Sequence, residues 1–266
     1  MTSPLSDDLV LAERQGPVLR LTLNRPAARN ALGTAMMSAL QEAFEAARED
    51  GCRVIVLMAA GSAFCAGHDL KELTALRTEP DRGRAAFAAI FAQCSQLMQT
   101  IVRHPKPVIA QVQGTATAAG CQLVASCDLA IASEAARFAT PGVNIGLFCS
   151  TPMVALSRNL ARKHAMEMLL TGEMISADRV RDFGLINRVV PADQLESETM
   201  RVAQLIASKP RATVKIGKEA FYRQVEQPLS AAYDYASQVM TENMLHAESE
   251  EGISAFVEKR EPKWSE

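Results

Sequence analysis

Two stretches rich in glycine and alanine carry the residue types and spacing that could do chemistry. The first, FCAGHDL at 64–70, comes shortly after the apolar run 53–58. The second, GTATAAGC at 114–121, directly follows the apolar run 108–113. A loop that ends a strand and opens a helix presents backbone N–H groups that no helical carbonyl accepts. Two such N–H groups directed at one oxygen form an oxyanion hole, which stabilises negative charge on a carbonyl oxygen.

The local backbone of the first stretch is set by two of its residues. Glycine has no Cβ, so the backbone at Gly67 can come close to a ligand. Asp69 is expected to cap a helix over Leu70–Leu76. A plainer interpretation of both stretches is a tight strand-to-helix connection that packs closely and holds no ligand.

Cysteine and histidine offer two further chemistries. Cys65 and His68 are spaced like metal ligands, but no second Cys/His pair accompanies them, so no metal site is predicted. Cys149 would need a neighbouring base to act as a nucleophile, and His68 is the candidate; otherwise Cys149 is a small buried apolar residue. The chain has 6 cysteines and no C-x-x-C pair, and we predict buried, reduced thiols.

Taken together, FCAGHDLKEL (64–73) and VQGTATAAGCQL (112–123) resemble the crotonase superfamily, the enoyl-CoA hydratase/isomerase group. The resemblance extends in order, and at the expected spacing, over almost the whole chain from residue 15. Its further segments are 23–26, 30–32, 127–132, 138–146, 170–173 and 183–190. The runs 140–152 and 259–264 are most like one branch of this superfamily.

The resemblance implies an α/β fold, a crotonase-like spiral of repeated ββα units over residues 1–190, which would hold the acyl-CoA site. A C-terminal helical region over 191–266 would make a homotrimer or a dimer of trimers. The implied ligand is an acyl-CoA thioester; no cofactor is implied, because coenzyme A is part of the substrate. The implied oxyanion donors are the N–H groups of His68 and Ala119. The family usually has glycine at the second position, and a Cβ there is tolerable if φ is negative.

At the catalytic positions this chain departs from the family. Water addition to an enoyl thioester needs a base and an acid, which the family supplies as two Glu side chains. The matching positions here are Gln122 and Gly142. Each lost acid or base typically costs about 10²- to 10⁴-fold in rate, so the standard hydratase mechanism is not expected. Ser150 matches the position at which dehalogenase and dienoyl isomerase relatives carry an Asp.

The resemblance also indicates where the substrate would lie. The backbone of 24–27 would border the adenine end of coenzyme A, with Arg25 near its phosphates; without the resemblance Arg25 is a solvated turn residue. The implied substrate-binding residues are Arg25, Ala66, Asp69, Leu70, Gly142, Asn144 and Cys149.

Three functions stay open. One is an enzyme nominally of the hydratase/isomerase class with unconventional acid and base groups: His68, Gln122 and a bound water. Another is an acyl-CoA decarboxylase or hydrolase that relies on the oxyanion hole, since loss of CO₂ itself generates the enolate. The third is a non-catalytic acyl-CoA binder. In each of them the His68 ring either enters the pocket, or the residue serves through its backbone alone.

Strands and helices alternate in the predicted elements that position these residues. Strands are predicted over 17–23, 53–58, 108–113, 128–132 and 187–190. Helices are predicted over 85–103 and 118–127, from a Thr34 cap, from Pro152, over 165–170, and from a Ser176 cap to Asp182. From 191 onward only amphipathic helices are predicted, over 192–208, 211–226, 229–246 and 249–260. Their apolar stripes, which we expect to form a subunit interface, include Met200, Leu205, Ile206, Met240 and Leu245.

Composition excludes several classes of protein. With 48% hydrophobic and 22% charged residues, the 266-residue chain is typical of soluble globular proteins. A net charge of −2 and no basic block give nucleic-acid binding no electrostatic support. No apolar run approaches the roughly 20 residues of a membrane span, so no membrane partner is expected. Residues 1–8 resemble neither a signal nor a transit peptide, which predicts a cytoplasmic location.

Overall fold

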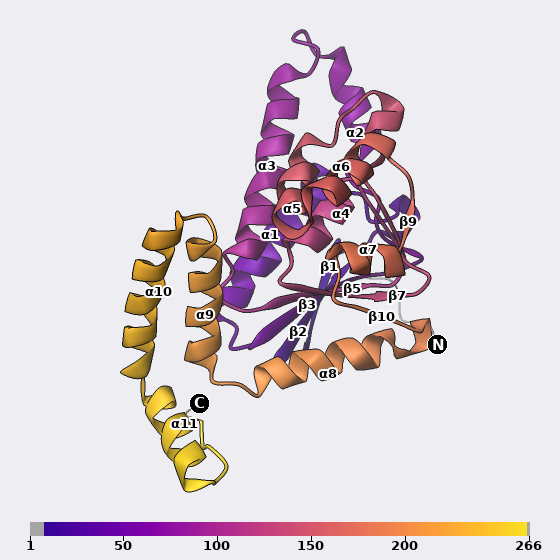
Figure 1. Cartoon of the computed structure of the whole chain (residues 1–266). Helices are drawn as coiled ribbons and strands as arrows, with labels where there is room; N and C mark the ends of the chain where they lie inside the picture. The colour runs from indigo at the N-terminus through magenta and orange to yellow at the C-terminus, as the bar shows by residue number, and fades with distance from the viewer. Residues whose placement is uncertain (1–7, 265–266) are drawn as a thin grey trace.

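Two β-sheets form the centre of the computed structural model, which describes residues 8–264 (Figure 1). The larger sheet has 6 strands in the order β1-β2-β3-β5-β7-β10, and the smaller has 4 in the order β4-β6-β8-β9. Only the β1–β2 and β8–β9 pairs are antiparallel among these described strands. The strands of the larger sheet are Val10–Gln15, Val18–Leu23, Val54–Ala59, Val108–Val112, Leu129–Ser133 and Arg188–Val190. Those of the smaller sheet are Ala63–Cys65 (β4), Thr115–Thr117 (β6), Arg137–Ala139 (β8) and Ile175–Ser176 (β9).

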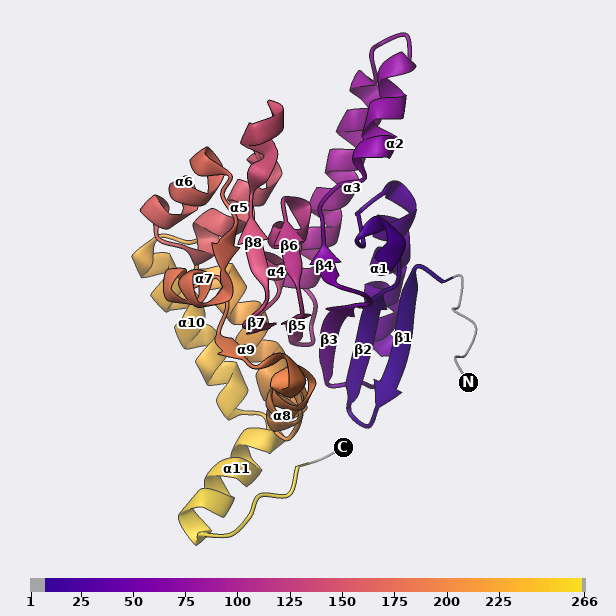
Figure 2. The ribbon, with the colours of Figure 1, turned by 90° about the vertical axis from the view of Figure 1, so that its right-hand side faces the viewer.

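The chain alternates between the two sheets as it advances. It passes from β3 to β4, from β5 to β6 and from β7 to β8, and helices follow each pair. This repetition confirms the predicted α/β spiral of ββα units. Figure 2 shows β4, β6 and β8 side by side above the ends of the larger sheet. The helices in this part are Thr34–Glu49 (α1), Leu70–Ala75 (α2), Arg84–Val102 (α3), Ala119–Ser126 (α4), Ser150–Asn159 (α5), Arg162–Thr171 (α6) and Ala177–Phe183 (α7).

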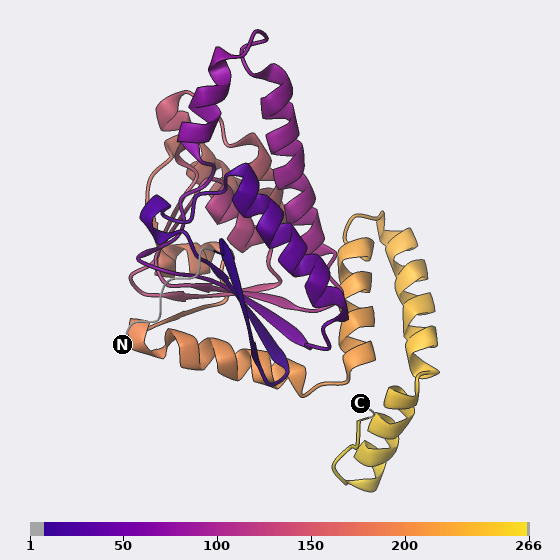
Figure 3. The ribbon, with the colours of Figure 1, turned by 180° about the vertical axis from the view of Figure 1, so that it is seen from behind.

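Apolar side chains on the two faces of the larger sheet form two separate cores. One core joins alternate residues of β2 and β3 to α1 and α3, with Phe44 and Leu97 fully buried in it. The other joins the opposite faces of β2, β3, β5 and β7, including Val56 and Ile109, to α8 (Leu195–Ala207). Figure 3 shows α8, drawn in orange, running along the side of the sheet opposite α1 and α3. Strands buried on both faces are expected for a parallel sheet, and they account for the continuous apolar runs in the sequence.

The last three helices, α9 (Arg211–Gln224), α10 (Leu229–Met244) and α11 (Ala247–Glu258), lie beside the sheets and not over them (Figure 1). The helical C-terminal region is therefore present as predicted. Its apolar stripes differ in burial: Met200 is buried against its own sheet, whereas Met240 and Leu245 are exposed.

Some elements differ from the sequence-based expectation. The helix α1 has Gly33 as its N-cap, and Thr34 is its first residue, where both its N–H and its hydroxyl bond Glu72. The strand β1 pairs with β2 as a hairpin that was not predicted. Within residues 8–264, α3 is long and apolar enough to cross a membrane by length and composition alone. Of its most apolar 18-residue stretch, 33% is buried inside the protein.

Candidate active site

The two glycine- and alanine-rich loops lie against each other because their preceding strands pair. Strand β4 is parallel to β6, with Ala63 opposite Thr115, so the loops that leave these strands emerge side by side. The Thr117 hydroxyl donates to the Ala66 carbonyl at 3.1 Å. A Cβ built on Gly67 would lie 3.3 Å from the backbone nitrogen of Ala119. The backbones at 66–68 and 117–119 are therefore in contact.

The backbone N–H groups of His68 and Ala119 have no hydrogen-bond acceptor within the described residues 8–264. The groups around them are engaged. The Leu32 N–H donates to the Gly67 carbonyl at 2.8 Å, and the Ala118 N–H donates to the Ala139 carbonyl at 3.0 Å. Ala119 is the first residue of α4, where an N–H has no intrahelical partner. Two uncommitted donors thus occur in two adjoining loops.

Ala118, just before the second donor, has an unusual backbone conformation. Its φ is 49° and its ψ is −119°, which is a region that glycine normally occupies. The Cβ that sits on an unusual backbone conformation in this loop is therefore that of Ala118. Ala119 is already the first residue of the helix. The conformation at Ala118 turns the chain from β6 into α4.

The His68 ring is held by two contacts. Its Nδ1 lies 3.3 Å from the Leu32 carbonyl, and the ring meets Phe91 edge-on with centroids 5.4 Å apart. With Nδ1–H as the donor, Nε2 is an acceptor, and this atom is buried with no partner in the described chain. Burial lowers the pKa of His68, although the Leu32 carbonyl and the charge of Glu72 oppose the effect. The ring is thus a neutral group at pH 7.

Two buried polar side chains near the second loop lack partners. Gln122 on α4 is 4% exposed and Thr140 is 0% exposed, and neither Gln122 Oε1 nor Thr140 Oγ1 has a hydrogen-bond partner among the described residues. Because β6 is parallel to β8, with Thr117 opposite Ala139, Thr140 lies next to Ala118. Unpaired buried polar atoms are uncommon and call for a ligand or water.

Gly142 is packed too tightly to carry any side chain. A Cβ there would lie 2.3 Å from the Leu147 carbonyl oxygen and 2.9 Å from Cys149 Sγ. The segment 147–149 therefore fills the space that a Glu side chain would need. Burial raises the pKa of Cys149, which keeps its thiol protonated.

Arg25 and Asp69 form one edge of the first loop. Arg25 Nη1 lies 2.9 Å from Asp69 Oδ2. Asp69 also caps α2, as predicted, by accepting from the N–H groups of Lys71 and Glu72. Burial alone would raise the pKa of Asp69, but these N–H donors and the Arg25 guanidinium together hold it below its ordinary value. Leu70 follows as an exposed apolar residue.

Two further predicted site residues, Ser150 and Asn144, are exposed. The Ser150 hydroxyl donates to the Phe148 carbonyl at 3.3 Å, and Asn144 Nδ2 donates to the Gly172 carbonyl at 3.4 Å. Thr140 and Ala118 were not singled out from the sequence. A threonine before a proline gives no sign that its hydroxyl is buried, and the backbone angles of an alanine cannot be read from its type.

All 6 cysteines are buried and free, as the sequence predicted. Burial raises the pKa of Cys65 and of Cys121 to about 12. Among the described residues, no group of at least 3 His, Cys, Asp or Glu side chains is arranged to hold a metal ion. Cys65 and His68 therefore have no further ligand beside them.

Comparison with known proteins places these features in a family. A family model described as enoyl-CoA hydratase/isomerase matches residues 13–266. The mouse protein named "Enoyl-CoA hydratase domain-containing protein 3, mitochondrial" is 49% identical over 258 residues, which cover 97% of this chain and 84% of the mouse protein. This similarity confirms the branch that the runs 140–152 and 259–264 indicated.

Solved structures give the same result. The crystal structure of an enoyl-CoA hydratase from Mycobacterium smegmatis is 53% identical with a TM-score of 0.92, covering 96% of this chain and 98% of that one. The crystal structure of human enoyl-CoA hydratase domain-containing protein 3 is 48% identical with a TM-score of 0.91, covering 96% of this chain and 100% of that one. Both comparisons confirm the crotonase-like fold.

The predicted cytoplasmic location is wrong. The mouse, rat and human relatives are named as mitochondrial proteins, which points away from the cytoplasm. The prediction used the composition of residues 1–8 alone. Nothing in the packing of the folded part specifies a compartment, so the fold could not have corrected it.

Proposed function

The chain belongs to the enoyl-CoA hydratase/isomerase family, and from this premise we propose that it binds an acyl-CoA thioester and stabilises negative charge on the thioester oxygen. The donors are the backbone N–H groups of His68 and Ala119. The observation that carries the proposal is the pair of uncommitted N–H groups in two loops that touch. Donors fixed in advance cost no reorganisation when charge develops on the substrate.

The Arg25 side chain and the exposed Leu70 are placed to contact the coenzyme A part of such a ligand. Arg25 is 43% exposed at its side chain and lies beside the first loop through its pair with Asp69. A guanidinium with a free edge can bind a coenzyme A phosphate. Ala66 and Leu70 would then lie along the part of the coenzyme A molecule that joins its phosphates to the thioester.

Standard water addition is not the chemistry that this site supports. Gln122 has no titratable proton, and Gly142 lacks a side chain and the room for one. Restoring a base should therefore be possible at position 122 and impossible at position 142. We expect Gln122→Glu to raise hydration of crotonyl-CoA about 10²-fold, and Gly142→Glu to give no gain. A Gln122→Glu protein no faster than the wild type would contradict this account of the site.

Decarboxylation of a malonyl-type thioester is the second candidate. It is favoured by the neutral polar lining, Gln122 and Thr140, whose oxygen atoms are buried and unpaired. Loss of CO₂ leaves its electron pair on C2 and forms the enolate directly, so an oxyanion hole is needed and a base is not. Neutral, buried side chains also disfavour a charged carboxylate in the ground state.

One experiment tests the binding claim. We expect crotonyl-CoA to bind the wild-type protein by calorimetry, and Ala119→Pro to weaken binding by about tenfold or more, because proline removes one N–H that bonds a developing charge. Proline is tolerated at the first position of a helix. Ala119→Gly, which keeps the N–H, is the matched control and should bind as the wild type does.

A mass-spectrometric screen of enoyl-, acyl- and malonyl-type thioesters then identifies the reaction. Product from a malonyl-type thioester alone supports decarboxylation. Hydrated crotonyl-CoA whose formation is lost in His68→Ala supports the hydratase class with an imidazole base. Binding with no product from any thioester supports a non-catalytic acyl-CoA binder.

A further inference from the structure

A cavity of about 370 Å³ lies at the end of the larger sheet opposite the acyl site. Its lining includes residues that precede β3 and β5, and the acyl-site loops come after the other ends of these strands. A strand of five or six residues spans about 16–20 Å. The cavity is therefore distinct from the candidate active site.

Positive charge dominates this cavity, although the whole chain has a net charge of −2. Two acidic side chains line it, Glu49 and Glu219. The cations that line it are Arg48, Arg53, Lys106, Lys209, Arg211 and Lys215. The positive excess is thus a local feature of one surface, formed where four separate segments meet.

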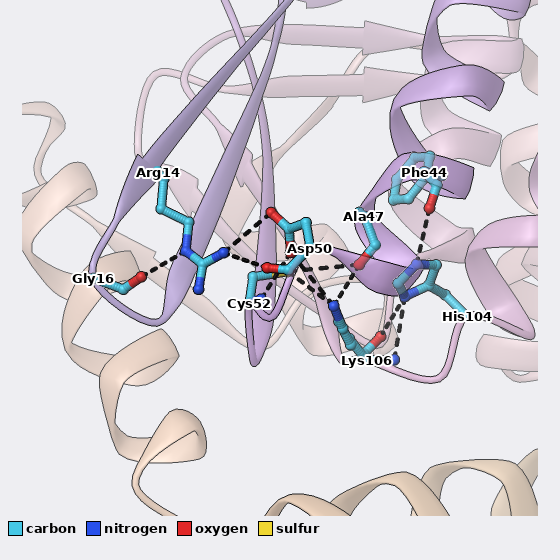
Figure 4. Close-up of polar contacts among 8 residues, drawn as sticks. All are labelled: Arg14, Gly16, Phe44, Ala47, Asp50, Cys52, His104 and Lys106. Atoms are coloured by element: carbon cyan, nitrogen blue, oxygen red, sulfur yellow. Dashed lines mark hydrogen bonds and ion pairs between the residues drawn. The ribbon is translucent and has the colours of Figure 1, made fainter. Parts of the chain in front are cut away.

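Two of the cations are already compensated. Figure 4 shows Lys106 directed toward Asp50 and the Ala47 carbonyl, and its Nζ lies 3.4 Å from Asp50 Oδ1. Arg48 Nε pairs with Glu45 at 2.6 Å. The other four cations, Arg53, Lys209, Arg211 and Lys215, have no carboxylate within 4.0 Å anywhere in residues 8–264.

The fold fixes the backbone that carries the uncompensated cations. Arg53 Nη2 donates to the Lys209 carbonyl at 2.6 Å, which joins the start of β3 to the end of α8. Arg211 and Lys215 are four residues apart on α9 and share one of its faces. The helix α9 is fixed to the core by Lys218, whose Nζ bonds Asp128 at 2.7 Å.

We propose that this cavity binds the diphosphate group of a small anion. Neighbouring cations with no carboxylate within 4.0 Å repel one another, and a diphosphate can pair with several of them at once. The cavity volume is within the roughly 300–1,000 Å³ range of small-molecule sites. Pro105, Pro107 and Ile206 give it an apolar wall as well. Free pyrophosphate and a nucleoside diphosphate share the chemistry that the cations recognise.

Pyrophosphate binding by calorimetry tests the proposal. The titration is made on protein saturated with crotonyl-CoA at about 0.15 M salt, so that the coenzyme A site is filled and exposed charges are screened. We expect binding that the double variant Arg211→Gln/Lys215→Gln weakens by about tenfold or more, since bonds to charged groups are lost. The matched control is Arg162→Gln/Lys163→Gln, which removes two exposed cations from α6 and should leave binding unchanged.

A parallel titration with ADP distinguishes the two sources. Tighter binding of ADP than of pyrophosphate would identify the ligand as a nucleoside diphosphate, with its base against the apolar wall. Equal affinity for the two would identify the ligand as the free anion. The proposal is overturned if neither ligand binds at millimolar concentration, or if both double variants weaken binding equally. Arg53→Gln provides an independent variant from another element, with the same expected loss. The contrast between the two double variants can also be measured on protein without crotonyl-CoA, so a failure of the acyl-CoA proposal would be distinguishable from a failure of this one.

Discussion

At the residue scale, the contact between the two loops leaves no room for a side chain at Gly67. Gly67 has a φ of 94°, and a Cβ there would lie 2.9 Å from the Cβ of Ala118 and 3.0 Å from the Thr117 carbonyl. Only glycine combines this backbone angle with so close an approach. A side chain at position 67 would therefore shift the His68 N–H relative to the Ala119 N–H.

We predict that Gly67→Ala separates the loops and abolishes acyl-CoA binding. It should also lower the free energy of unfolding by about 1–3 kcal/mol, because a non-glycine residue is held in a strained conformation. Urea denaturation and calorimetry with crotonyl-CoA measure the two effects. Gly217→Ala, at a glycine inside α9 with open space around it, is the control and should leave acyl-CoA binding intact. Wild-type affinity in Gly67→Ala would show that the loop contact is irrelevant.

A second residue-scale prediction concerns His104, which is fully buried and neutral. Its Nδ1 accepts from the Lys106 N–H at 3.1 Å, and its Nε2 donates to the Phe44 carbonyl at 3.1 Å (Figure 4). Burial, with the charge of Lys218, lowers its pKa from 6.5 to about 4. Between these two values the unfolded chain binds more protons than the folded one. Stability from this group is therefore complete above pH 6.5 and is lost as the pH falls toward 4.

The loss should reach on the order of 3 kcal/mol near pH 4. Urea denaturation at several pH values should show a steeper decline for the wild type than for His104→Gln. His164→Gln serves as the control, because His164 is only partly buried on α6, and its decline should match the wild type. Parallel declines in wild type and His104→Gln would contradict the prediction.

Sequence reasoning singled out the two loops and the Asp69 cap but not their local geometry. The Asp69 cap and the two loops were predicted because an acidic residue before a helix and glycine after a strand have direct physical meaning. The positive φ of Ala118 and the burial of the Thr140 hydroxyl depend on strand pairing between β6 and β8, which no residue type reports.

At the element scale, α9 is joined to the core by one buried ion pair. Lys218 is 6% exposed at its side chain and bonds Asp128, and it also donates to the carbonyls of Ile101 and Lys106. The helix thereby connects the end of α3, the start of β5 and the start of β7. The C-terminal helices are held to the spiral at this point.

Lys218→Met should destabilise the protein by on the order of 3–5 kcal/mol, because it leaves the Asp128 carboxylate with no cation beside it in the described chain. Lys215→Met, one turn earlier on the exposed face of the same helix, should change stability little. Both are measured by urea denaturation. Equal stability of the two variants would mean that the ion pair does not hold α9 in place.

The elements with long apolar patterns were the ones most readily predicted from the sequence. The long apolar runs of β3 and β5 and the helix α3 were found, since their patterns extend over five or more residues. Strands β4, β6 and β8 have 3 residues each, too few to show alternation, and the sequence left them unassigned. Helix α8 was grouped with the helices after it, because only the structure shows that the sheet has a second apolar face to cover.

At the scale of the whole molecule, exposed apolar side chains cluster on the C-terminal helices. Leu245 is 78% exposed and Phe256 is 84% exposed. Others are Phe221, Val225, Leu229, Tyr233, Met240, Met244, Ile253 and Val257. Exposed apolar side chains gathered in one region are typical of an interaction surface, and these support the proposed assembly as a homotrimer or a dimer of trimers.

We predict that analytical ultracentrifugation finds three or six copies of the 28.8 kDa chain, and that Leu245→Asp/Phe256→Asp gives monomers, because each charge would be buried in an apolar interface. Leu170→Asp, at an exposed apolar residue of α6, should leave the assembly intact. A monomeric wild type, or an assembly that only the α6 variant disrupts, would contradict an interface on the C-terminal helices.

The most direct test of the central claim is the infrared carbonyl frequency of crotonyl-CoA carrying ¹³C at the thioester carbon. Two N–H donors polarise that carbonyl, so its stretching frequency should fall when the ligand binds the wild-type protein and should fall less in Ala119→Pro. Bound crotonyl-CoA whose carbonyl frequency equals that of the free ligand would show that His68 and Ala119 do not bond the thioester oxygen.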